Sequence, residues 1–134
     1  MGIRTVECLD WKATDRPGEM LTFAEGFRKD GINLDALWGY VDSKNGARIA
    51  AVGKNPARLK AALRKRGVKP RVCEGFYVTG KDRIGALVDV FKKLSSAKVN
   101  IECAEAYATQ GKYAGTIWVD RSNFKKAKKV LGLR

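Results

Sequence analysis

The segment GFYVTGKD, residues 75 to 82, comes within one residue of a loop that binds nucleotide phosphates. The pattern G-x-x-x-x-G-K-[ST] ends in a hydroxyl that binds magnesium, and Asp82 stands in that place here. A carboxylate repels phosphate, and the FYVT between the two glycines favours a strand. Strand amides point at neighbouring strands and do not converge on an anion. We therefore interpret the segment as a β-strand and not as a nucleotide-binding loop.

Side chains for nucleophilic or metal chemistry are scarce in this chain. It has no histidine, which removes the commonest general base and the commonest metal ligand. Cys8, Cys73 and Cys103 have no CxxC spacing, so we interpret them as reduced core residues on strands. Catalysis would have to use Glu7, Glu74 or a lysine, and no pattern selects them. We expect no enzyme activity, no catalytic residue, no metal and no cofactor.

Length and composition narrow the class of protein. The 134 residues suffice for one compact domain or two very small ones, and 45% apolar with 31% charged residues is typical of a globular protein. No apolar run approaches the roughly 18 residues of a membrane helix. The first residues, MGIRTVECLDWK, have no apolar signal region. We expect a cytoplasmic protein without a membrane segment.

The chain repeats itself at an offset of 82 − 15 = 67 residues. The gaps between matching blocks have the same length in both copies until the last helix, where one residue slips. The aligned blocks are TDRPGEML (14–21) with KDRIGALV (81–88), GINLDALWGY (31–40) with KVNIECAEAY (98–107), and ARIAAV (47–52) with AGTIWV (114–119). We interpret the chain as two copies of one unit, residues 1–68 and 69–134.

Each copy predicts the order strand, helix, strand, strand, helix. In the first copy DRPG begins a helix, Gly31 ends it, and the Asn-Gly pair in SKNG (43–46) predicts a hairpin turn. Residues 68–72 and 131–134 are candidates for a short last strand. The fold class is therefore α+β: two tandem ferredoxin-like βαββαβ units, each a four-stranded antiparallel sheet with two helices on one face. Units this small are marginal alone, so we expect them to pair.

The motifs at the start of the first helix and of the second strand resemble those of the ACT domain, and they occur twice. The first copy has DRPG (15–18) and GINL (31–34), and the second has DRIG (82–85) and VNI (99–101). The resemblance covers essentially the whole chain, as a free-standing protein of two ACT domains. It implies a regulatory protein that binds a small molecule, most often an amino acid, and modulates a metabolic enzyme. A homodimer is expected.

The resemblance also implies where the ligand lies. The turn before the first helix meets the start of the second strand, often at an interface between two domains. Helix N-termini suit a carboxylate, and asparagine can both donate and accept hydrogen bonds. We prefer the first copy because Ile84 replaces proline in the second. The implied residues are Asp15, Arg16, Pro17, Gly18, Glu19, Met20, Asn33 and Leu34, and then Asp82, Arg83, Ile84, Gly85, Ala86, Leu87, Asn100 and Ile101.

Each of these residues also has a purely structural interpretation. Asp15 and Asp82 can serve as helix caps, and the two asparagines can form loop-to-strand turns. The glycines can serve turn geometry, and the arginines can be solvated. Trp38, Tyr40 and Tyr107 are expected on the sheet face away from the helices, where they would cover that face or form a dimer contact. Pairing of the units without any ligand is a third possibility.

The net charge of +13 leaves two interpretations open. Lysine and arginine are concentrated in the last helix expected in each copy, PARLKAALRKRG (56–67) and NFKKAKKVLG (123–132), where they form the polar side of an amphipathic helix. The more specific interpretation is a basic surface that binds nucleic acid or an acidic protein. The aromatic pattern of RNA-recognition domains is missing from ARIAAVG and AGTIWVD, so we do not expect nucleic acid as a partner. A basic RNA-binding or protein-interaction module stays the alternative function.

Overall fold

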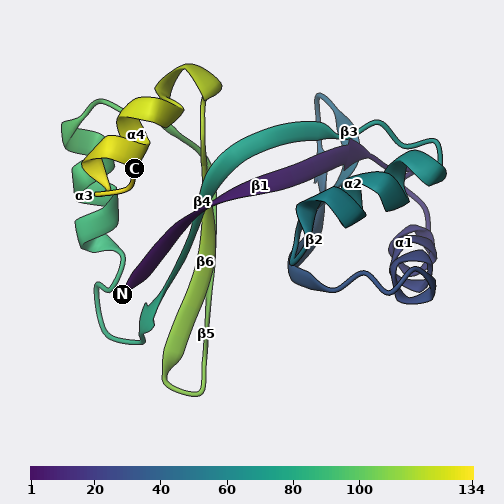
Figure 1. The fold of residues 1–134 in the computed structure, drawn as a ribbon, viewed down its shortest axis with the longest axis horizontal. Coiled ribbons are helices and arrows are strands. Elements are labelled where there is room, and N and C mark those ends of the chain that lie inside the picture. The colour runs from purple at the N-terminus through teal and green to yellow at the C-terminus, as the bar shows by residue number, and fades with distance from the viewer. The chain divides into compact units, whose positions relative to one another are not determined.

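A computed structural model describes all residues from Met1 to Arg134. Its elements repeat the predicted order twice along the chain (Figure 1). They are β1 (Gly2–Lys12), α1 (Glu19–Lys29), β2 (Leu34–Asp42), β3 (Gly46–Gly53), α2 (Pro56–Lys65), β4 (Arg71–Lys81), α3 (Val88–Ser96), β5 (Ile101–Thr109), β6 (Lys112–Val119), a 3-10 turn η1 (Arg121–Asn123) and α4 (Phe124–Val130). The α+β class and the ferredoxin-like units are confirmed. All four α-helices are too short or too polar to span a lipid bilayer.

The chain folds into two compact units that do not follow the sequence in one block each. Unit A is Glu7–Val72, and unit B joins Met1–Val6 to Cys73–Arg134. Strands β1 and β4 therefore each supply residues to both units. The break after Val72 lies close to the repeat boundary expected at residues 68 and 69, whereas a repeat alignment does not indicate that the first six residues join unit B.

Unit A has the strand order β2-β3-β1-β4, which is that of a ferredoxin-like sheet. Strands β1 and β2 both pair antiparallel with β3, as in Leu9 opposite Ala51 and Trp38 opposite Ala50. Helix α2 begins at Pro56, and the Asn55 side chain caps it by accepting from the Arg58 N–H at 3.2 Å. Both helices of unit A cover one face of its strands (Figure 1).

The core of unit A lies between that face and the helices. Trp11 is 1% exposed and packs against Phe23 and Phe27 of α1, with ring centroids 5.4 and 6.2 Å apart. Leu59 and Leu63 of α2 complete the cluster. Their spacing places both on the same side of the helix, so α2 buries its apolar stripe and leaves its basic residues outside.

Unit B has the strand order β1-β4-β6-β5, and the first residues of β1 take the place of its fourth strand. A Cβ on Gly2 would lie 3.0 Å from Thr79 Oγ1, and the Arg4 guanidinium stands 4.6 Å over the Tyr77 ring. Residues 131–134 form no strand, which corrects the expectation of a short one there. Leu131 instead closes the core, since the neighbouring edge of β4 is already paired with β1.

The core of unit B lies under α3 and α4. Phe76 and Val78 of β4 are buried with Val90 and Leu94 of α3, and Phe124 stacks on Phe76 at 5.3 Å between centroids. Figure 1 shows α3 and α4 on the same face of the unit's strands. These contacts are the second copy of the arrangement in unit A, built from different residues.

Residues 75–81 of the segment that resembles a phosphate loop lie in β4, and Asp82 follows the end of the strand. The seven residues pair with β6, from Gly75 opposite Trp118 to Lys81 opposite Lys112. A Cβ on Gly75 would lie 2.4 Å from the Ile117 carbonyl oxygen, so this glycine permits a close approach of two strands. The interpretation of the segment as a strand is confirmed.

Candidate functional site

The turn before α1 in unit A is held by its own side chains. Glu19 accepts a hydrogen bond from the Thr14 N–H and lies 3.5 Å from the Arg16 guanidinium. The Thr14 hydrogen bond, with a smaller effect from Arg16 and against an opposing effect of burial, lowers the pKa of Glu19. Gly18 is the N-cap, with φ of 89°, and no side chain caps the helix. The interpretation of Asp15 as a helix cap is therefore wrong.

The other predicted residues of unit A lie at two ends of α1. The Met20 side chain lies beside Gly39, because a Cβ there would meet Met20 Cε at 3.1 Å. Asn33 follows the C-terminal end of α1, where its Oδ1 accepts from the Leu34 N–H at 3.0 Å. The 11 residues of α1 span about 16 Å. Unit A therefore does not bring the turn and Asn33 together.

A groove of about 450 Å³ opens at the Asn33 end of unit A. Asn33 and Leu34 line it beside Phe27 and Arg28 of α1. The lining includes none of the predicted turn residues, 15 to 20. The Asn33 carbonyl oxygen accepts from the Lys54 N–H at 3.0 Å, so the turn interpretation of this asparagine agrees with its contacts.

The turn before α3 in unit B lines a groove of about 350 Å³. Gly85 has φ of 73°, and the Asp82 N–H donates to the Gly111 carbonyl at 2.9 Å. Leu87 is the N-cap and α3 has no side-chain cap, so the interpretation of Asp82 as a cap is wrong as well. The lining residues are Asp82, Arg83, Gly85, Ala86 and Leu87 of the turn, Val88 and Phe91 of α3, Ala106, Tyr107 and Ala108 of β5, and Tyr113 of β6.

Three predicted residues of unit B lie outside this groove. Ile84 is fully exposed to solvent. Asn100 is exposed before β5, and Ile101 packs against the core. Ile101 and Ala106 are five residue steps apart on β5, about 16 Å of strand, so the turn and Asn100 stay apart, as in unit A.

Tyr113 is the polar residue of the groove that sequence reasoning missed. It is 7% exposed, and its hydroxyl is buried with no hydrogen-bond partner. Its ring lies across Gly80, its partner on β4, where a Cβ would meet Tyr113 Cε1 at 2.7 Å and the hydroxyl oxygen at 2.9 Å. At the offset of 67 residues, 113 − 67 = 46, the first copy has Gly46 instead. A search for shared residues therefore passes over Tyr113.

The hydroxyl of Tyr113 makes the groove chemically distinct. A buried polar group without a partner costs about 1–3 kcal/mol, and such groups are rare in folded proteins. A ligand that displaces the side chains covering this hydroxyl and brings a donor or acceptor to it would satisfy it. Asp82 and Arg83 add one charge of each sign beside mostly apolar walls. The groove thus offers places for an ammonium, a carboxylate and an apolar side chain.

The open face of unit A carries a buried charge cluster. Asp10 is 0% exposed and accepts from Arg48 Nε at 2.7 Å, Arg71 Nη2 at 2.8 Å and the Tyr40 hydroxyl at 3.1 Å. Partial burial, with the adjacent Asp10 charge, raises the pKa of Tyr40 to about 12. Tyr107, at the equivalent place in unit B, is 70% exposed.

The residues considered for catalysis or metal binding do not form a cluster. Glu7 pairs with Lys60 at 2.6 Å, and the three cysteines are free. No group of three or more histidine, cysteine, aspartate or glutamate side chains could hold a metal ion.

The fold is known from other proteins, although the sequence is distant from them. No protein-family model matches the chain, and no curated protein matches it by sequence. The structure of protein BT0572 from Bacteroides thetaiotaomicron superimposes with a TM-score of 0.77 at 21% identity, over 96% of this chain and 86% of that one. The ligand-free regulatory subunit of aspartate kinase from Thermus thermophilus gives 0.62 at 16%, over 98% and 95%.

The structure of the regulatory subunit of aspartate kinase from Thermus flavus superimposes with a TM-score of 0.60 at 15% identity, over 98% of this chain and 95% of that one. These likenesses extend over nearly the whole of each chain. They confirm the resemblance to a tandem ACT-domain protein at the level of the fold.

Proposed function

We propose that this protein binds a small molecule, an amino acid in class, and thereby regulates a metabolic enzyme. The unpartnered hydroxyl of Tyr113 in the unit B groove is the observation that carries the proposal. Asp82 would pair with the α-ammonium, Arg83 with the α-carboxylate, and the apolar walls would hold the side chain. The fold shared with aspartate kinase regulatory subunits supports a regulatory role.

The groove changes which copy we favour. Sequence reasoning preferred unit A because Pro17 stiffens its turn. In unit A, however, Met20 lies against Gly39, the residue aligned with Ala106, and Gly46 stands in place of Tyr113. The same region of unit A therefore lacks the buried hydroxyl. We propose the unit B turn as the primary ligand site.

The asparagines fit the proposal through a second copy of the chain. Turn and asparagine lie at opposite ends of a helix or strand in each unit, so one ligand cannot touch both within a unit. We propose a homodimer in which the turn of one copy faces Asn33 or Asn100 of the other. The groove at Asn33, beside Arg28, would supply the second half of such a site.

The proposal also concerns catalytic activity and the cellular compartment. We propose that it has no catalytic activity of its own and that the regulated enzyme is a separate protein. Three free cysteines fit a reducing compartment such as the cytoplasm.

The experiment is a thermal-shift screen of the purified protein against the twenty common amino acids, with nucleotides and a short RNA alongside. A ligand at about 100 times its dissociation constant stabilises the folded state by about 2.7 kcal/mol, which moves the Tm by several degrees. We expect one or two amino acids to raise the Tm. The shift should disappear in Arg83→Ala and persist in Arg121→Ala, an exposed arginine of unit B outside the groove.

Two outcomes would contradict the proposal. A shift with RNA alone would favour the basic-surface alternative. A shift with an amino acid that persists in Arg83→Ala and disappears in Arg16→Ala would move the site to the turn of unit A.

A further inference from the structure

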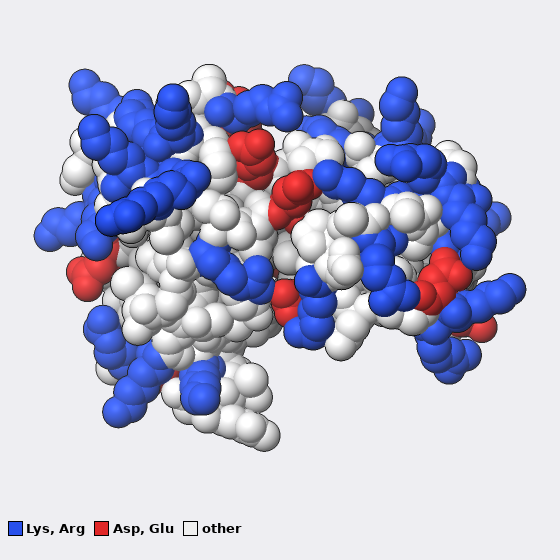
Figure 2. Space-filling model, viewed as in Figure 1, with Lys and Arg blue, Asp and Glu red and all other residues white.

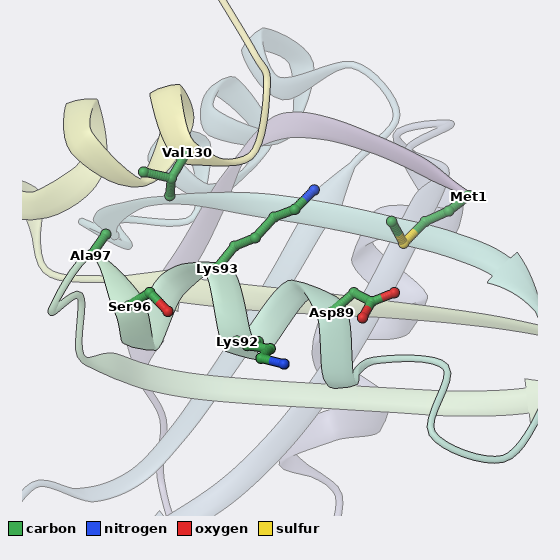
Figure 3. A pocket seen from close by; sticks show the side chains of 7 residues that line it. All are labelled: Met1, Asp89, Lys92, Lys93, Ser96, Ala97 and Val130. Carbon is green, nitrogen blue, oxygen red and sulfur yellow. The ribbon is translucent and has the colours of Figure 1, made fainter.

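A second groove of unit B lies between its two helices, on the other side of α3 from the Tyr113 groove. Its volume is about 570 Å³. Figure 3 shows Lys93 of α3 and Val130 of α4 pointing into the space between the helices. The lining residues are Met1, Asp89, Lys92, Lys93, Ser96, Ala97 and Val130. We call it the lysine groove.

The lysine groove is surrounded by positive charge that the protein does not neutralise. Helices α3 and α4 carry the six lysines 92, 93, 125, 126, 128 and 129, and none of them forms an ion pair. Unit A, by contrast, pairs many of its cations, as in Arg66 with Asp30 at 2.6 Å. Figure 2 shows lysine and arginine side chains gathered over the helices of unit B. An acidic partner would supply the missing counter-charges.

The lining of the lysine groove distinguishes between kinds of acidic partner. Met1, Ala97 and Val130 give it apolar surface, to which the methylene stems of the lysines add. No aromatic side chain lines it, so nucleic-acid bases have nothing to stack on.

We propose that the lysine groove docks an acidic amphipathic helix of a partner protein. The helix would place apolar side chains at intervals of three or four residues against Met1, Ala97 and Val130. Its flanking glutamates or aspartates would meet Lys92, Lys93 and the lysines of α4. This surface would hold the partner whether or not an amino acid occupies the other groove, so the proposal stands independently of the ligand.

The test measures binding of a fluorescein-labelled amphipathic peptide of about 14 residues, with leucines on one face and glutamates on the other, by fluorescence anisotropy. The same composition in scrambled order separates amphipathicity from charge. The double variant Lys92→Glu/Lys93→Glu should weaken binding at least about tenfold, since each lost attraction becomes a repulsion. The matched control Lys81→Glu/Lys112→Glu makes the same charge change on the exposed β4–β6 end of unit B.

A second variant tests the groove without altering charge. Ser96→Phe fills the space beside Ala97 from an exposed position, so the fold should persist, as circular dichroism would verify. It should weaken the amphipathic peptide as strongly as the charge reversal does. The scrambled peptide should bind weakly to every variant.

Several outcomes would overturn the proposal. Equal loss in both charge-reversed variants would show only diffuse attraction to a basic protein. Equal binding of the scrambled peptide, or no effect of Ser96→Phe, would show that the groove is not used. A single-stranded RNA or vesicles with phosphatidylserine that bind where the peptide does not would assign the surface to a nucleic acid or a membrane.

Discussion

Replacing Tyr113 with phenylalanine separates a ligand-binding hydroxyl from a structural one. The change removes one oxygen and leaves the ring packed on Gly80. Because the hydroxyl is buried without a partner, it contributes a desolvation cost of about 1–3 kcal/mol and no hydrogen bond in return. We therefore expect the free energy of unfolding of the ligand-free variant to equal or exceed that of the wild type.

With ligand bound, the same substitution should have the opposite effect. A hydrogen bond to the ligand contributes about 0.5–1.5 kcal/mol, so its loss should weaken binding by roughly two- to twelvefold. Urea unfolding followed by circular dichroism measures the first quantity, and calorimetry with the amino acid found by the screen measures the second. Tyr107→Phe is the control for stability, since that tyrosine is 70% exposed.

Two results would refute this reasoning. A decrease of about 1 kcal/mol or more in the free energy of unfolding of ligand-free Tyr113→Phe would show that the hydroxyl already has a hydrogen-bond partner in the protein. It would then give no reason to expect a ligand at this position. Unchanged ligand affinity would show that the ligand does not reach Tyr113.

Three further substitutions test the structure itself. Asp10→Asn should destabilise the protein by about 1.5–3 kcal/mol in urea unfolding, because it removes the buried carboxylate that accepts hydrogen bonds from Arg48, Arg71 and Tyr40. An unchanged free energy of unfolding would contradict this. The hydrogen bond from Arg66 lowers the pKa of Asp30, so Asp30→Asn should lower the free energy of unfolding at neutral pH. The difference from the wild type should vanish as the pH falls through the folded-state pKa of Asp30, which lies below 3.8. A difference that does not change with pH would contradict this. Gly115→Ala should destabilise the protein by about 1–3 kcal/mol or more in thermal unfolding, since its Cβ would lie 2.3 Å from a backbone carbonyl oxygen of β5. In the control Gly2→Ala the Cβ meets only a side-chain hydroxyl at 3.0 Å, so the loss of stability should be small.

Local sequence signals predicted the elements well. Gly31, with φ of 68°, ends α1 as expected, and the Asn-Gly turn joins β2 to β3. The strand at GFYVTGKD could be predicted because aromatic and β-branched residues filled it and the repeat lacked its glycines. Such features depend on residues close in sequence, where propensity and turn chemistry decide the outcome.

The strand that completes unit B could not be predicted in the same way. Nothing local distinguishes residues 2–6 as partners of β4 from residues 131–134, and the pairing joins segments more than seventy residues apart, as Gly2 and Thr79 do. Tyr113 was missed for another reason. Repeat comparison selects what the copies share, whereas this side chain matters because the copies differ there.

The interpretation of Asp15 and Asp82 as helix caps failed for a geometric reason. A capping side chain must stand directly before the first helical turn. The helices begin at Glu19 and Val88, later than the DR pairs would require, with Gly18 and Leu87 between. The aspartates thus lie in open turns, free to meet another molecule.

Because β1 and β4 supply residues to both units, the chain cannot be divided into two complete halves at the repeat boundary. A chain cut at the repeat boundary would leave residues 69–134 without the strand that pairs with β4, and residues 1–68 without Arg71, the partner of Asp10. Neither half is a complete module, so two separately expressed halves should reassemble, as in fragment complementation.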